Sequence, residues 1–152
     1  MAFAKPSLKG RALRLLSQRE HSRAELERKL ASFEEAPGAL AQALDELQAK
    51  GFISEVRVLE SVLHRRAAKL GALRIRQELQ DKGLAPPLIA QAMDELRGSE
   101  LARAHEIWRS KFGQPADSPA AQARQARFLL ARGFSAEVVR RVLKTAAIDD
   151  AG

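Results

Sequence analysis

The chain has 152 residues, of which 45% are hydrophobic and 5% aromatic, so it can form a core and lacks the composition of a disordered chain. It contains no cysteine, which excludes disulfides and thiolate metal sites. Lys and Arg number 26 against 19 Asp and Glu, and the net charge of +7 favours a polyanionic partner, although a merely solvated basic surface gives the same count.

The sequence shows no sign of a membrane segment. No apolar run approaches the roughly 20 residues that a helix needs to span a bilayer. The first residues also differ from a signal peptide, because Lys5, Pro6 and Lys9 interrupt the apolar stretch. We therefore expect a soluble, cytoplasmic protein.

The first third of the chain predicts three helices. Residues 1–6 are expected to form a frayed lead, after which Ser7 can cap a first helix. Ser22 and Glu25 have the spacing of a capping box, which begins a second helix, and a third helix ends at Gly51. The apolar positions of these helices are Leu13, Leu15 and Leu16, then Leu26, Leu30 and Phe33, then Leu40, Leu44 and Leu47.

The middle of the chain predicts three more helices. Ser54 can cap a fourth helix, which closes on a basic cluster at residues 64–66 where cations meet the negative end of the helix dipole. A fifth helix follows Gly71 and ends at Gly83, where we expect a positive φ because the position fits a left-handed C-terminal cap. The pair Pro86-Pro87 suits the first turn of a sixth helix, where a proline loses no helical hydrogen bond.

The last third predicts helices seven to nine. The seventh carries Trp108, which we expect in the core. The eighth begins at Ser118-Pro119 and ends at Gly133, where we again expect a positive φ. Ser135 can cap the ninth, and residues 149–152 are expected to form a frayed tail. No sustained alternation of polar and apolar residues predicts a strand.

An internal repeat organises these helices. Six of the eight residues in 40–47 are identical to those in 89–96, at an offset of 49. At an offset of 50, apolar residues of the second repeat match apolar residues of the third, and Gly83 matches Gly133. The sequence therefore predicts an all-α fold, an elongated tandem array of three three-helix repeats that are helix-turn-helix-like units. The expected domains are 1–53 with the N-terminal lead, 54–98 and 99–148, followed by the tail.

Basic residues gather in repeats two and three. No acidic residue lies between Glu60 and Glu78, and the cations in this window straddle Gly71, so they can converge from two helices. Any single cation is as consistent with a solvated surface as with a binding site. Together the cations favour a binding surface, because many weak contacts to phosphates add up. The expected polyanion-binding patch comprises Arg65, Arg66, Lys69, Arg74, Arg76, Arg124, Arg127, Arg132, Arg140 and Arg141.

Residues of the kind that carry catalysis are scattered. His21, His64 and His105 do not lie at metal-ligand spacing, and no glycine-rich phosphate loop is present. The acidic pairs 45–46 and 94–95 recur as the solvent edge of equivalent helices. We therefore expect no metal, no cofactor and no catalytic site.

Three stretches resemble the RecX family, the bacterial regulators of the RecA recombinase. Residues 19–26 (REHSRAEL) with Lys29-Leu30 resemble its opening segment, and residues 50–53 (KGFI) resemble its link between repeats. Residues 74–79 (RIRQEL) with 82–84 (KGL) resemble its central segment. The chain departs from the family at residues 54–59, which contain no phenylalanine.

The resemblance implies a small non-enzymatic protein that lies along the groove of the RecA–single-stranded DNA filament and restrains recombination and coprotease activity. It also implies weak direct DNA binding, and we expect a monomer. Two alternatives stay open from the residues: a helix-turn-helix protein that binds DNA directly, and a protein adaptor whose charge only aids solubility. Under the first alternative, residues 25–27 (ELE) would approach phosphates badly.

Overall fold

The computed structural model describes residues 5–151, and its regular structure is entirely helical in that range. The nine expected α-helices are confirmed within it, and residues 1–4 of the expected lead lie outside it. The elements are α1 (Leu8–Leu16), α2 (Arg23–Leu30), the 3-10 helix η1 (Ala31–Phe33), α3 (Ala39–Ala49), α4 (Glu55–Arg66), α5 (Ala72–Asp81), α6 (Pro86–Arg97), α7 (Glu100–Lys111), α8 (Pro119–Ala131) and α9 (Ala136–Ala151).

The expected caps set the helix ends. The Ser7 hydroxyl accepts the Gly10 N–H at 3.0 Å at the start of α1. At the start of α2, Ser22 and Glu25 form the reciprocal capping box, each side chain accepting the other's backbone N–H at 3.1 Å. Serine hydroxyls begin three further helices in the same way, at Ser54, Ser118 and Ser135.

The glycine caps are also confirmed. Gly83 has a φ of 72° and Gly133 a φ of 97°, so both adopt the left-handed conformation that ends a helix. One expectation is wrong. Phe33 lies in η1 and is 44% exposed, because α2 stops at Leu30 and the 3-10 turn rotates the ring out of the core. The helix α9 continues to Ala151, so residues 149–151 of the expected tail are helical, and residue 152 lies outside the described residues.

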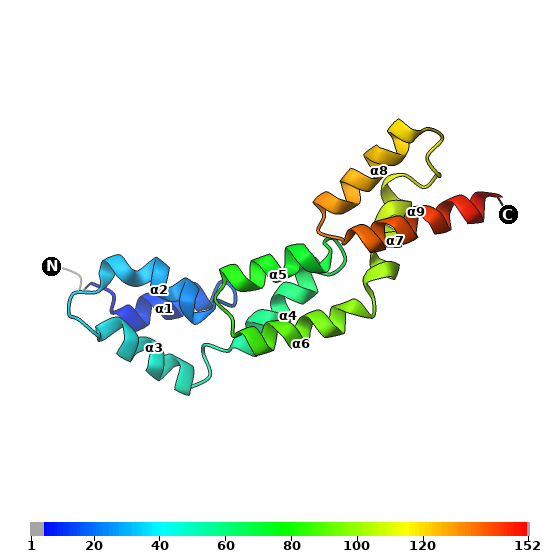
Figure 1. Cartoon of the computed structure of the whole chain (residues 1–152). Helices are drawn as coiled ribbons and strands as arrows, with labels where there is room; N and C mark the ends of the chain where they lie inside the picture. Colours follow the sequence, from blue (N-terminus) through cyan, green and yellow to red (C-terminus); the bar gives the residue numbers. More distant parts are fainter. Residues whose placement is uncertain (1–4, 152) are drawn as a thin grey trace.

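Each repeat has an apolar core of its own. Leu44 in the first, Ile75 in the second and Leu129 in the third are fully buried. Trp108 lies in the third core as expected, with its indole N–H donating to the Gln125 side chain at 2.9 Å. The repeats follow one another along an elongated body (Figure 1), as expected for a tandem array.

The middle helices of the repeats, α2, α5 and α8, meet end to end (Figure 1). We call the contact between repeats one and two the first junction. There the N-terminal end of α2 meets the C-terminal end of α5, and the Ser22 hydroxyl donates to the Lys82 carbonyl at 2.6 Å. The Arg28 guanidinium donates to the Asp81 carbonyl at 2.9 Å. Partners from α2 thus satisfy carbonyls that end α5.

The second junction joins repeats two and three in the same sense. The N-terminal end of α5 meets the C-terminal end of α8, and backbone binds backbone directly. The Gly71 N–H donates to the Arg132 carbonyl at 2.7 Å, and the Leu73 N–H donates to the Gly133 carbonyl at 3.1 Å. The positive dipole end of one helix therefore faces the negative end of the next.

Candidate nucleic-acid interface

The ten cations of the expected patch lie on or beside four helices. Three follow one another at the end of α4 and just beyond it, and two lie on α5. The other five lie on α8, at its C-terminal cap and on α9. All are exposed except Arg66 and Arg132, which are partly buried. The structure distributes them over several places and does not gather them into one.

Arg65 and Arg66 share a polar hollow at the first junction, which we call the Glu78 hollow. The carboxylate of Glu78 lies 3.0 Å from the guanidinium of Arg66 and 3.9 Å from that of Arg65. The window without acidic residues is thus acid-free along the sequence only, because Glu78 folds back onto it. The hollow is completed by side chains from both repeats: Arg19, Glu25, Arg28, Asp81 and Lys82.

Glu25 is the buried anion of this hollow. It is 7% exposed, and its carboxylate accepts hydrogen bonds from Arg19 at 2.7 Å and from Lys82 at 3.2 Å, besides the Ser22 N–H. Burial raises the pKa of Glu25, but these three hydrogen bonds outweigh it and hold the pKa at about 2. Glu25 therefore stays charged near neutral pH, where it binds two of the cations of the hollow.

His21 is buried beside the same junction and is 1% exposed. Its Nδ1 lies 3.0 Å from the Arg19 carbonyl, and its Nε2 lies 3.4 Å from the Lys29 ammonium. A neutral ring that donates from Nδ1 and accepts at Nε2 satisfies both neighbours. Burial and the two nearby cations lower the pKa of His21, although the hydrogen bond to the Arg19 carbonyl raises it.

Lys69 and Arg132 meet in a second hollow, at the second junction, which we call the Phe128 hollow. Lys111 and Glu106 line it with them. The Arg132 guanidinium lies 4.9 Å from the centre of the Phe128 ring, and the Lys111 ammonium lies 5.4 Å from it. Two cations therefore lie near one partly buried aromatic ring, and Lys69 and a single acid line the same hollow.

The remaining cations of the patch lie apart from these two hollows. Arg74 is committed to the second junction, where its guanidinium donates to the Ala131 carbonyl at 2.8 Å. Arg76 lines a groove between α5 and α6, and Arg140 lines one between α8 and α9. Arg124, Arg127 and Arg141 are exposed on α8 and α9.

The structure adds cations that the sequence alone does not single out. Arg19, Arg28 and Lys82 enter the Glu78 hollow, and Lys111 enters the Phe128 hollow. Arg19 and Lys82 lie in the stretches that resemble the RecX family, which is a sequence signal for both residues. No local pattern in the sequence shows that the two side chains meet. Arg103 from α7 is different, because it donates to the carbonyls of Ala67 and Leu70 and so satisfies the end of α4.

Two general features complete the description of residues 5–151. No group of three or more His, Asp or Glu side chains among them is placed to hold a metal ion. None of their helices is long and apolar enough to cross a membrane.

The fold and the junctions define an all-helical tandem-repeat protein of three three-helix domains. Sequence models of the first, second and third three-helix domains of RecX match residues 9–47, 54–93 and 99–143. The chain belongs to the RecX family of regulatory proteins, and a regulatory role follows from that membership.

Individual relatives agree. Regulatory protein RecX of Leptothrix cholodnii is 54% identical over 96% of this chain and 94% of its own length. The protein of the same name from Ralstonia nicotianae is 44% identical over 95% and 92%. The crystal structure of RecX from Lactobacillus salivarius has the same fold, with a TM-score of 0.75 and 20% identity over 93% of this chain and 95% of that one.

Proposed function

We propose that this protein regulates the RecA recombinase by binding, as a monomer, along the groove of the RecA–single-stranded DNA filament and restraining recombination and coprotease activity. One observation supports the proposal most directly. Each junction carries a hollow lined by cations from the two repeats that meet there, the Glu78 hollow at the first and the Phe128 hollow at the second. A body with cations at successive junctions suits a long, regular polyanion.

In this proposal the protein acts by occupying the groove of the filament, and it catalyses no reaction on a substrate. Lys and Arg neutralise phosphates and release counterions, which makes affinity fall with salt. The elongated array (Figure 1) offers many such contacts along its length, and a protein lying in the groove excludes other ligands from it. The proposal includes no catalytic step, cofactor or metal.

The Phe128 hollow provides the sharper test, because Lys69 and Arg132 do not share a carboxylate as Arg65 and Arg66 share Glu78. The variant replaces Lys69 and Arg132 with glutamine, and binding to preformed RecA filament is measured across a salt series. Each lost contact should reduce the slope of log affinity against log salt by about 0.7. The double variant should therefore bind more weakly, with a slope flatter by about 1.4.

A matched control removes the same charge elsewhere. Lys50 and Arg14 are exposed cations at the ends of α3 and α1, outside both hollows. Their double glutamine variant should retain the affinity and slope of the parent, with circular dichroism confirming helix content in both variants. Equal losses in the two double variants would show that only net charge matters and would contradict a groove-binding role for the hollow.

The same measurement on bare duplex and bare single strand separates the direct DNA-binding alternative. One observation favours α9 for such a role. The acidic pairs Asp45-Glu46 on α3 and Asp94-Glu95 on α6 are replaced at the equivalent position of α9 by Lys144-Thr145. Binding to bare duplex as tight as binding to the filament would favour this alternative over RecA regulation.

A further inference from the structure

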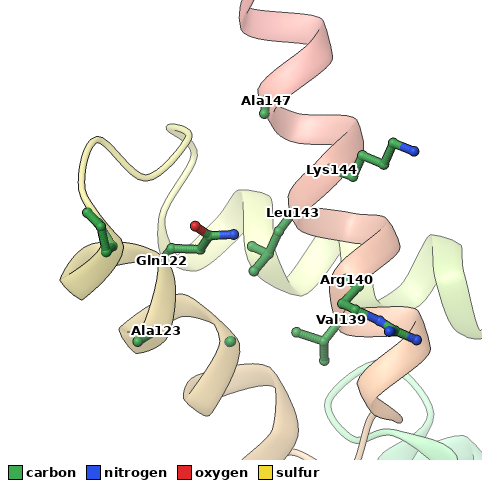
Figure 2. Close-up of a pocket in the computed structure, with 9 residues that line it drawn as sticks. Gln122, Ala123, Val139, Arg140, Leu143, Lys144 and Ala147 are labelled. Carbon is green, nitrogen blue, oxygen red and sulfur yellow. The ribbon is translucent and has the colours of Figure 1, made fainter.

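An apolar groove lies between α8 and α9 on the surface of repeat three (Figure 2). Leu143 projects from α9 towards α8, while Arg140 and Lys144, which also line the groove, extend in this view from the side of α9 away from α8. The floor is aliphatic and contains no aromatic ring, and neither rim contains an acidic residue. The groove is lined by Pro119, Gln122, Ala123, Ala126, Val139, Arg140, Leu143, Lys144 and Ala147.

The same groove occurs in repeat two, between α5 and α6. At the repeat offset of 50 residues, Ile89 and Met93 take the floor positions of Val139 and Leu143. Its charges differ, because Arg76 and Arg97 are accompanied by Asp94. This groove is therefore of mixed charge, whereas the groove of repeat three is purely basic.

In repeat one, a side chain of the protein covers the corresponding face. Arg23 of α2 reaches across to α3, where it binds Asp45 at 2.6 Å, the Gln48 side chain at 3.0 Å and the Ala41 carbonyl at 3.3 Å. It also pairs with Glu27 on α2 at 3.1 Å. In repeat one, where the rim is acidic, the apolar stem and the guanidinium of Arg23 thus cover this face.

The partners of Arg23 correspond to residues of the open grooves. Asp45 becomes Asp94 in repeat two and Lys144 in repeat three, so the rim charge reverses along the chain. Arg23 itself corresponds to Ala72 in repeat two and to Gln122 in repeat three, so neither groove has a guanidinium at this position. The groove of repeat three is therefore open, and its basic rim favours a negatively charged occupant.

We propose that the α8–α9 groove docks an acidic amphipathic helix of a partner protein. Apolar side chains of such a helix would lie over Val139 and Leu143, and its carboxylates would pair with Arg140 and Lys144. An aliphatic floor without an aromatic ring offers nothing on which a nucleic-acid base can stack, and its apolar surface does not suit phosphate. The proposal concerns a protein ligand and not the phosphate contacts described above. It does not depend on RecA being the partner.

The test uses the full chain and two fluorescein-labelled synthetic peptides. Both are helix-forming with one stripe of Leu and Ala, and they differ only in having Glu or Lys beside the stripe. By fluorescence polarisation, the acidic peptide should bind at least about tenfold more tightly than the basic one. Replacing both Arg140 and Lys144 with glutamate, at exposed positions of α9, should invert this preference.

A second pair of variants locates the binding. Ala123→Phe should fill the groove of repeat three and abolish binding of the acidic peptide. Ala90→Phe fills the groove of repeat two from an alanine that is also exposed and should leave binding unchanged. The proposal is overturned if neither peptide binds, if both bind equally, or if Ala90→Phe blocks binding as well. It is also overturned if a single-stranded oligonucleotide, but no peptide, requires the α8–α9 groove.

Discussion

The two junctions join the same parts of the repeats by different means. At the first, side chains make the contact: a serine hydroxyl and an arginine bind the last carbonyls of α5, and Lys82 pairs with buried Glu25. At the second, backbone N–H groups of α5 bind the carbonyls that end α8 at 2.7 and 3.1 Å. Direct backbone contact requires that no Cβ atom stand between the two helices.

The difference follows from two glycines. A Cβ at Gly71 would lie 2.4 Å from backbone atoms of Gly133 and Phe134, and one at Gly133 would lie 2.6 Å from the Arg74 nitrogen. At the first junction, a Cβ at Gly83 would lie 2.7 Å from the Ala24 Cβ, so the close approach there is to a side chain and not to backbone. The second junction is therefore fixed by backbone packed against backbone, and the first by side-chain hydrogen bonds and charge.

The largest expected effect comes from Gly71→Ala. Gly71 has a φ of −80°, which suits any residue, so the whole penalty comes from the clash with the backbone of repeat three. We expect a loss of about 3 kcal/mol or more in the free energy of unfolding, measured by urea denaturation. Trp108 fluorescence, which reports on repeat three, should then separate from circular dichroism, which reports on all repeats.

Gly51→Ala is the control for this comparison. Gly51 has a φ of 83°, but a Cβ there meets no atom within 4 Å. Only the left-handed backbone is penalised, so we expect a loss of about 1 kcal/mol. Equal losses at positions 71 and 51 would show that the second junction does not contribute through close contact.

Glu25→Gln should have the next largest effect, at the first junction. The substitution removes the charge that Lys82 and Arg19 bind, while the Lys82 ammonium remains largely buried. We expect a loss of about 2 kcal/mol in urea denaturation near neutral pH. The control Glu106→Gln breaks a surface pair with Arg109 and should change stability by less than about 0.5 kcal/mol. If Glu25→Gln loses no more stability than the control variant, the ion pairs of Glu25 do not stabilise the first junction.

The first junction should also be the more sensitive to acid. Folding lowers the pKa of His21 below its ordinary value of 6.5, so the unfolded chain binds the proton more tightly. Stability should therefore be complete above 6.5 and fall as the pH drops below it. Glu25 adds a second loss as the pH falls from its ordinary 4.5 towards about 2.

Denaturation measured at about pH 7.5 and about pH 5.5 isolates the histidine, because Glu25 stays ionised over that range. His21→Gln, which keeps a donor and an acceptor, should reduce the difference in stability between the two conditions. His105→Gln is the control, since His105 lies in repeat three beside Trp108 and outside the first junction. A pH dependence that persists in His21→Gln would assign it to other groups.

The smallest effect is expected for Arg74→Ala. Its hydrogen bond to the Ala131 carbonyl lies at the exposed edge of the second junction, so we expect a loss of about 0.5–1 kcal/mol in urea denaturation. Arg76→Ala removes an exposed cation two residues away, on the same helix, and should change stability by a few tenths of a kcal/mol at most. Identical stability of the two variants would mean that Arg74 does not support the junction.

Much of the fold was encoded locally and could be predicted from the sequence. Ser22 with Glu25 marks a helix start, and Gly83 and Gly133 mark helix ends, because capping depends on residues within one turn of the terminus. The repeat was visible for a similar reason, since each copy needs the same apolar spacing to form its own core. The apolar spacing predicts Phe33 on the core face of α2, which is wrong because spacing alone does not show where a helix stops.

Only the tertiary structure decided which distant groups meet. Gly71 has an ordinary φ, so its requirement for glycine arises entirely from the approach of Gly133 in the next repeat. Charged side chains leave no periodic signal of their partners, and Glu78 therefore pairs with Arg65 and Arg66 although no acidic residue lies between Glu60 and Glu78 along the chain. Local patterns determine helices and cores, whereas the placement of one repeat on another determines the junctions, the hollows and the open groove.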